Sequence, residues 1–278
     1  MQKAEHQAQK GYFTFVQNSD VDYLSIAYLQ ALSIKATQSI NQYAIAVDSN
    51  TKELITDEHR KVFDYIIDIP NDEAKDSSWK LENEWMAWHL TPFKETIKLD
   101  SDIIFTRNID HWWGICQQKE VCCTIKVRDY EGKVADDSVF RALHKTNNLP
   151  SVYSGFTYFR YSRFSMEFFN LVRAVFQNWS LFRDKLLKDC RHNKANTDEA
   201  YAIAALLMGE EDCYLPGNIP TFAHMKGPIQ GWGHVNWQDH LYAQVQDKQL
   251  TVGFNRQQYP FHYVNKEFAT GEIIDQYK

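Results

Sequence analysis

The N-terminal part of the chain alternates short apolar runs with stretches of helical spacing, and this alternation constrains the fold most strongly. The apolar runs predict strands at residues 11–16, 43–47, 65–69 and 95–99. Between them, residues 22–35 and 56–63 carry apolar side chains at helical intervals. Strands separated by helical segments of this length pair in parallel through right-handed crossovers. The sequence therefore predicts an α/β fold with a mixed, mainly parallel sheet flanked by helices.

The rest of the 278-residue chain has a less regular pattern. We expect residues 103–105 to resume the fourth strand and residues 152–160 to form a further strand. We expect helices at residues 78–89, 166–179 and 196–208. The aromatic side chains of the C-terminal region fit a core as well as a surface that stacks on a sugar or base. No internal repeat divides the chain, so we predict a single domain over residues 1–278.

Charge and cysteine content exclude several classes of protein. The chain has 30 Lys and Arg against 36 Asp and Glu, a net charge of −6, which does not favour bulk binding to nucleic-acid phosphates. The five cysteines are an odd number without metal-binding spacing, so we expect them to be reduced and the protein to be cytoplasmic. We expect no signal peptide and no membrane span, because no window approaches 18 uninterrupted apolar residues.

Asp100-Ser101-Asp102 follows the predicted fourth strand directly. Ligands of open α/β sheets bind beyond the carboxyl ends of the strands, so this position is well placed for chemistry. Two carboxylates one residue apart can hold a hard divalent ion, Mn²⁺ or Mg²⁺, and leave coordination positions open for phosphate oxygens. A second triplet, Asp20-Val21-Asp22, fits a helix cap. For a bare Asp-x-Asp, solvated turn residues are the alternative interpretation.

The context of the motif, residues 88–110, resembles the family of glycogenin and the lipopolysaccharide galactosyltransferases. Trp88-His89-Leu90-Thr91 precedes the strand and Asn108-Ile109-Asp110 follows the acidic pair, as in that family. The resemblance extends over residues 11–235. Further segments match the family in order: residues 15–18 with Tyr23 and residues 32–35, then residues 153–155, 196–200 and 224–232. Family members are retaining glycosyltransferases of the GT-A fold. The resemblance therefore implies metal-dependent transfer of a sugar from a nucleotide sugar, with UDP expected, to an acceptor hydroxyl with retention.

Carried over residue by residue, the resemblance implies three sets of site residues. The metal set is Asp100, Asp102 and His224, and an imidazole followed by a close-packing glycine suits that role chemically. The donor-binding set is Gln17, Asn18, Tyr23, Lys80, Ser101, Ser154, Gly155, Lys226 and Gly227. Asp198 and Glu199 form the catalytic set, in which they orient the sugar hydroxyls or the acceptor without serving as an assigned nucleophile.

The same resemblance implies a division of labour along the domain. Residues 11–110 are expected to form the half that binds the nucleotide sugar. Residues 150–240 are expected to complete the metal site and to bind the acceptor. Residues 241–278 are then a C-terminal extension.

Three positions depart from the family pattern. Glu84 stands where the family has a lysine, and Lys80, one helical turn earlier, is the expected substitute. Gln230 replaces a phosphate-binding lysine, although Lys226 is nearby, and Tyr153 replaces an asparagine. These departures motivate a first alternative, a non-catalytic GT-A domain that binds glycans or serves as a scaffold.

Local charge motivates a second alternative. Residues 156–194 hold eight Lys and Arg against three Asp and Glu. An anionic acceptor fits such a segment, and a glycosyltransferase that acts on hydroxylated bases in DNA is the resulting alternative. A solvated helical face explains the same charges without a ligand. Likewise, Asp198 and Glu199 suit the first turn of a helix without any catalytic role.

Overall fold

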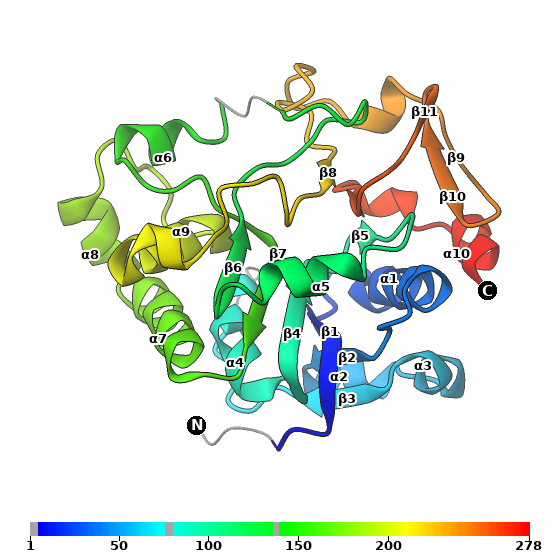
Figure 1. Ribbon diagram of the computed structural model, residues 1–278, viewed down its shortest axis with the longest axis horizontal. Helices are drawn as coiled ribbons and strands as arrows, with labels where there is room; N and C mark the ends of the chain where they lie inside the picture. Colours follow the sequence, from blue (N-terminus) through cyan, green and yellow to red (C-terminus); the bar gives the residue numbers. More distant parts are fainter. Residues whose placement is uncertain (1–4, 76–79, 136–138) are drawn as a thin grey trace.

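A mixed sheet forms the centre of the protein (Figure 1). The computed structural model describes residues 5–75, 80–135 and 139–278, and within them this sheet has six strands in the order β3-β2-β1-β4-β7-β6. The strands are β1 (Ala8–Val16), β2 (Tyr43–Val47), β3 (Tyr65–Asp68), β4 (Phe93–Leu99), β6 (Val121–Thr124) and β7 (Tyr153–Arg160). Strands β1 to β4 run parallel, whereas β7 pairs antiparallel with both β4 and β6. The predicted α/β fold with a mixed, mainly parallel sheet is confirmed.

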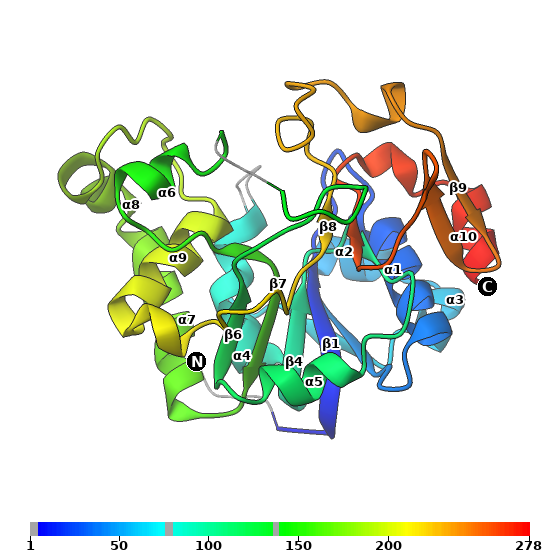
Figure 2. The same ribbon diagram turned by 45° about the horizontal axis from the view of Figure 1, so that its top comes forward.

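Successive side chains of the strands enter two separate cores, one on each face of the sheet. Phe13 shares one core with the buried faces of α7 (Arg163–Gln177) and α9 (Thr197–Met208). The adjacent Tyr12 shares the other core with α1 (Tyr23–Thr37) and α5 (His111–Cys116). Figure 2 shows α7 and α9 grouped on one side of the molecule and α1 on the other. The helices therefore leave the carboxyl ends of the parallel strands open for a site.

Helix starts follow the expected capping chemistry. Asp22 caps α1 by accepting a hydrogen bond from the backbone N–H of Ser25, which confirms the cap predicted for the second Asp-x-Asp triplet. At α9, Asn196 and Glu199 form a reciprocal capping box. The other α-helices are short: α2 (Ser49–Glu53), α3 (Asp57–Val62), α4 (Ala87–Leu90), α6 (Ala142–Thr146), α8 (Trp179–Leu181) and α10 (Gly271–Tyr277).

Residues 103–105 do not resume the fourth strand, so that prediction is wrong. β5 (Ile103–Ile104) belongs to a separate small sheet, in which it pairs antiparallel with β12 (Phe261–His262). β12 also pairs in parallel with β8 (Ala223–His224). β7 pairs with β4 only as far as Leu99, so the buried residues of β5 find their hydrogen-bond partners in β12 instead. The C-terminal region is thereby brought beside the acidic motif.

The remaining elements complete the chain without entering the central sheet. The predicted helix at residues 78–89 is a 3₁₀ helix, η1 (Lys80–Met86), followed by α4, and residues 78–79 lie outside the described part. β9 (Ala243–Gln246), β10 (Gln249–Val252) and β11 (Asn255–Arg256) form a small antiparallel sheet. Short helical turns are η2 (Phe182–Leu186), η3 (Glu210–Asp212), η4 (Trp237–Asp239) and η5 (Lys266–Phe268). Among the described residues, none of the helices has the length and apolar character needed to cross a membrane.

The close packing around Gly11 leads to a first prediction about the central sheet. A Cβ atom at Gly11 would lie 2.4 Å from the buried ring of Phe93 on β4, so Gly11→Ala should destabilise the fold by about 1–3 kcal/mol through overpacking. Gly114→Ala in α5 is the control, because a Cβ atom there would meet no described atom within 4 Å outside its chain neighbours and its own helix backbone, and alanine favours a helix. Urea unfolding measures both changes. Equal stability of the two variants would contradict the packing seen between β1 and β4.

Candidate active site

A cavity of about 530 Å³ lies at the carboxyl ends of β1 and β4. Segments that are far apart in the sequence line it: the turn after β4, η1, the start of α9, β8, and the segment after β12. Its ionisable lining residues include Lys80, Glu84, Asp100, Asp102, Asp198, His224, Lys226, His262 and Lys266. Acidic and basic groups thus surround one space, as in a site built for a charged ligand.

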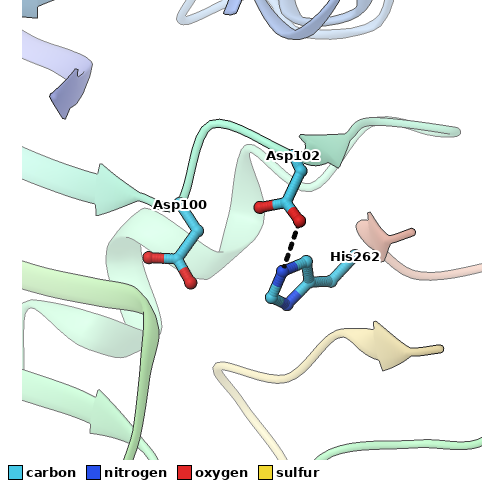
Figure 3. Close-up of side chains that lie close together, drawn as sticks. All are labelled: Asp100, Asp102 and His262. Atoms are coloured by element: carbon cyan, nitrogen blue, oxygen red, sulfur yellow. Dashed lines mark ion pairs between the residues drawn. The ribbon is translucent and has the colours of Figure 1, made fainter. Parts of the chain in front are cut away.

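Asp100 and Asp102 lie in the turn between β4 and β5, and backbone hydrogen bonds hold this turn. The N–H of Asp100 donates to the carbonyl of Gly155 (2.9 Å), and the N–H of Tyr263 donates to the carbonyl of Asp102 (3.2 Å). Oxygen atoms of the two carboxylates and a ring nitrogen of His262 lie within 4.8 Å of one another (Figure 3). Two carboxylates and one imidazole form a donor set that suits a divalent ion such as Mn²⁺. The structure therefore forms a candidate metal site at the predicted acidic motif.

His224, the imidazole expected in the metal set, lines the cavity and stacks on His262. Their ring centroids are 4.6 Å apart and the ring planes differ by 6°. Both rings bury an Nδ1 atom that has no hydrogen-bond partner among the described residues. Burial, assisted by nearby cationic side chains, lowers the pKa of His224 well below its usual value, so its ring is neutral and able to ligate. As a metal ligand His224 stays a prediction, now beside His262.

His262 was missed by the sequence analysis, and so was Lys266. The ring Nε2 of His262 lies 3.0 Å from Oδ2 of Asp102, and the ammonium of Lys266 ion-pairs with the same oxygen. Burial opposes ionisation of Asp102, but its interactions with His262 and Lys266 outweigh it and hold the pKa of Asp102 well below the usual range. No motif or spacing marks either residue. They reach Asp102 only because β12 pairs between β5 and β8.

Lys98 and Glu84 form a buried ion pair behind the acidic motif. The Lys98 side chain is fully buried on β4, pairs with Glu84, and also lies 3.2 Å from Oδ1 of Asp100. Burial disfavours its charge, yet the Glu84 carboxylate outweighs that cost and raises the pKa of Lys98, which stays an ammonium. Glu84, the departure from the family pattern, therefore holds the cation that contacts Asp100. In the sequence, the position of Lys98 two residues before Asp100 was the feature that could have indicated this contact.

Asp198 and Glu199, the predicted catalytic pair, differ in their surroundings. Asp198 lines the cavity, ion-pairs with Arg141 at 2.8 Å, and accepts hydrogen bonds from the N–H and Oγ of Ser154. Burial opposes its charge, but Arg141 and Lys226 outweigh it, so the pKa of Asp198 lies well below its usual range. Glu199 instead closes the capping box of α9 and pairs with His192. Glu199 thus has the structural role that the sequence left open as its alternative.

The predicted donor-binding residues mostly lie around this cavity. Its lining includes Gln17, Tyr23, Lys80, Ser101, Gly155 and Lys226. Ser154 reaches it indirectly, because its hydroxyl bonds to Asp198 and Thr197. Asn18 instead accepts from the N–H of Leu24 and donates to Asp22, so its side chain supports the start of α1. Their contacts with a donor stay predictions.

Two glycines of the predicted set have a steric reason to be glycine. A Cβ atom at Gly155 would lie 2.8 Å from Oδ2 of Asp100. At Gly227, a Cβ atom would lie 2.4 Å from the carbonyl oxygen of Gly233, which fits the close backbone approach expected after His224. Both positions therefore keep the walls of the site close together.

The residues at the other departures from the family pattern also make contacts within the site. The amide of Gln230 donates to the carbonyl of His224 at 2.8 Å, so it supports the backbone of β8. The Arg141 guanidinium lies 3.6 Å from the ring centroid of Tyr153 and bonds to Asp198. The ammonium of Lys80 donates to the backbone carbonyls of residues 74 and 75.

The basic segment 156–194 is largely neutralised by neighbouring acids. Arg163 pairs with Glu167 and Arg183 with Asp184. Other basic side chains of the segment pair with acids elsewhere: Arg160 with Glu120, Arg173 with Glu73, and Lys194 with Glu82. Such pairing favours a solvated helical surface, and the structure offers the DNA alternative no support.

Comparisons with known proteins find similarity in solved structures only. No protein-family model and no curated protein matches the sequence. Mouse xyloside xylosyltransferase 1 in its apo form is 11% identical, with a TM-score of 0.42 over 75% of this chain and 84% of the other. The glycosyltransferase GlyE of Streptococcus pneumoniae TIGR4 is 9% identical, with a TM-score of 0.45 over 76% of this chain and 46% of the other. The bifunctional glycosyltransferase WbbM is 15% identical, with a TM-score of 0.38 over 60% and 35%.

This chain therefore spans less than half the length of GlyE and about a third of WbbM. Scores and identities this low leave the activity of the chain to be argued from its own site.

The buried ion pair gives a prediction about stability. Lys98→Met removes the cation and leaves Glu84 buried without it, which should cost about 3–5 kcal/mol in urea unfolding. Lys98→Met with Glu84→Gln should recover part of that loss, because no uncompensated carboxylate remains at position 84. The control is Lys52→Met, which breaks the exposed pair with Asp68 and should cost about 1 kcal/mol at most. Similar losses from Lys98→Met and Lys52→Met would rule out a strong buried pair.

Proposed function

We propose that this chain is a GT-A glycosyltransferase that uses Mn²⁺ or Mg²⁺ to transfer a sugar from a nucleotide sugar, UDP-linked, to an acceptor hydroxyl with retention. The observation that carries the proposal is the convergence of Asp100, Asp102 and His262 in a cavity at the carboxyl edge of the sheet. This donor set suits a hard divalent ion, and a cavity of about 530 Å³ is in the size range of small-molecule sites. The resemblance of residues 88–110 supports the choice of donor.

The charges around the cavity support a diphosphate as the part of the donor nearest the acidic motif. A bound divalent ion would neutralise negative charge that develops on the diphosphate leaving group. Lys226 and Lys266 line the same cavity, and ammonium groups are good hydrogen-bond donors to phosphate oxygens. Lys80 lines it as well, on the side of η1. Fixed cations around a leaving anion lower the barrier mainly by electrostatics.

Asp198 is the residue that we assign to the sugar. Its carboxylate is ionised, lines the cavity, and is held by Arg141 and Ser154. A carboxylate fixed in this way can accept hydrogen bonds from sugar hydroxyls and hold the anomeric carbon toward the acceptor. We assign no enzymic nucleophile, and retention rests on the family resemblance.

A second hollow supports a glycan acceptor beside the donor. It has a volume of about 420 Å³ and shares Lys226 and Val264 with the main cavity. Trp237, Asn236 and Glu267 contribute apolar and polar lining, a mixture that suits a sugar.

Location in the cytoplasm is supported by the free thiols of all five cysteines in the structure.

Turnover with a panel of nucleotide sugars tests the proposal. The protein with Mn²⁺ should release UDP from at least one UDP-sugar, and excess EDTA should abolish release. If no donor in the panel is consumed, with or without glycan acceptors, the proposed activity is wrong. Full activity in EDTA would overturn its dependence on a metal.

Single substitutions separate the candidate metal ligands. Asp100→Asn and Asp102→Asn should each lower turnover by about 100-fold or more, because each removes a charged ligand. His224→Ala and His262→Ala, compared over a range of Mn²⁺ concentrations, identify the imidazole that ligates: its loss should raise the Mn²⁺ concentration needed for half-maximal activity. Asp68→Asn, an exposed carboxylate at the end of β3, is the control and should leave turnover unchanged. Unaltered Mn²⁺ dependence in both histidine variants would exclude an imidazole ligand.

A further inference from the structure

Each carboxylate of the acidic motif already has a lysine partner. Lys98 lies 3.2 Å from Asp100, and Lys266 ion-pairs with Asp102. The three acids of this cluster, Asp100, Asp102 and Glu84, are therefore opposed by two ammonium groups before any ion arrives. A divalent ion that binds both aspartates enters a space where much of the negative charge is already balanced, and repulsion between like charges weakens its binding.

The two lysines differ in their freedom to move. Lys98 is fully buried and shared with Glu84, so it is held from two sides. The side chain of Lys266 is 30% exposed and lines the cavity, so it can leave Asp102 without crossing the core. It shares one oxygen of Asp102 with His262, a member of the candidate metal set. Lys266 is thus the cation that stands in the position where an ion and Asp102 would meet.

The backbone next to Lys266 has the geometry of a strained turn. Val264 has φ of 61°, a left-handed conformation that β-branched residues rarely adopt. It lies between the end of β12 and Lys266, and it lines the cavity. The hydrogen bond from the N–H of Tyr263 to Asp102 and the ion pair of Lys266 hold both sides of this turn to the same aspartate. Release of Lys266 therefore removes one of the contacts that hold this turn to Asp102.

We propose that Lys266 is an internal counter-cation of Asp102, which a divalent ion must displace, so that the ion binds tightly only together with a nucleoside diphosphate. The proposal rests on the metal-dependent function proposed above. The diphosphate supplies the anionic oxygens that take over the released ammonium, and the cost of breaking the ion pair is offset only when they are present. Metal and nucleotide binding are then coupled through one side chain.

Mn²⁺ binding to the full chain tests this, without any need for turnover. Calorimetry or electron paramagnetic resonance gives the affinity for Mn²⁺ alone and with saturating UDP. Lys266→Met should bind Mn²⁺ alone at least about tenfold more tightly than the wild type, because no ammonium competes for Asp102. The gain in Mn²⁺ affinity on adding UDP should be smaller in Lys266→Met than in the wild type. Lys266→Arg keeps the charge and should bind Mn²⁺ alone as weakly as the wild type.

Lys226→Met is the matched control. It removes one ammonium from the same cavity, and the ammonium of Lys226 lies over the ring of Phe140 at 4.7 Å. Its affinity for Mn²⁺ alone should rise clearly less than that of Lys266→Met. An equal rise in both variants would mean that only the general field of the cavity matters, and it would overturn the proposal. Unchanged or weaker Mn²⁺ binding by Lys266→Met would overturn it as well.

If Lys266→Met fails to fold, a measurement on the wild-type protein still tests the proposal. The ¹³Cε signal of Lys266, assigned by its absence in Lys266→Arg, should move when Mg²⁺ and UDP are added together, and a signal that stays in place overturns the proposal. These measurements test the metal-dependent function and the role of Lys266 separately. Absence of Mn²⁺ binding in every variant, even with UDP, overturns the metal-dependent function together with this proposal. Mn²⁺ binding that is indifferent to residue 266 overturns the counter-cation alone.

Discussion

The arrangement of charges at the carboxyl end of β4 is the constraint on which the site depends. Lys98 has no solvent to stabilise its ammonium, so its charge persists only because Glu84 and Asp100 are both within reach. In return, the buried ammonium holds Asp100 at the edge of the cavity. On the other side of the turn, His262 and Lys266 do the same for Asp102. Two aspartates are thus held close together, and the pKa of Asp102 is kept low.

The C-terminal segment completes this balance, although it lies farthest away in the sequence. β12 fills the place between β5 and β8, so the backbone ladder sets His262 opposite His224 and next to the turn that holds Asp102. The segment expected to be an extension of the domain therefore supplies two of the groups that contact the acidic motif. One structural consequence is that the main cavity and the second hollow share Lys226 and Val264.

Most of the framework could be predicted because it depends on local pattern. The strands at residues 11–16 and 43–47 are continuous apolar runs, and Asp22 caps the helix that follows the first of them. The strand at residues 103–105 was placed in the wrong sheet, because a short apolar run is compatible with any neighbour that offers hydrogen bonds, and β12 could not be foreseen from weak periodicity. At position 84, the sequence showed only that a glutamate replaces the lysine of the family pattern. Its ion pair could not be predicted, because its partner Lys98 lies on another element.

By itself, the sequence determined the α/β class, the parallel pairing of the strands that begin the sheet, and the position of two carboxylates at a strand end, since periodicity and adjacency along the chain are enough for these. Tertiary structure alone decided which groups neutralise those carboxylates. Lys98 and Lys266 are equivalent cations in a list of residues, and nothing local distinguishes the one locked in the core from the one facing the cavity. The energy of a charge depends on burial and on partners brought from distant segments, and only the folded chain sets both.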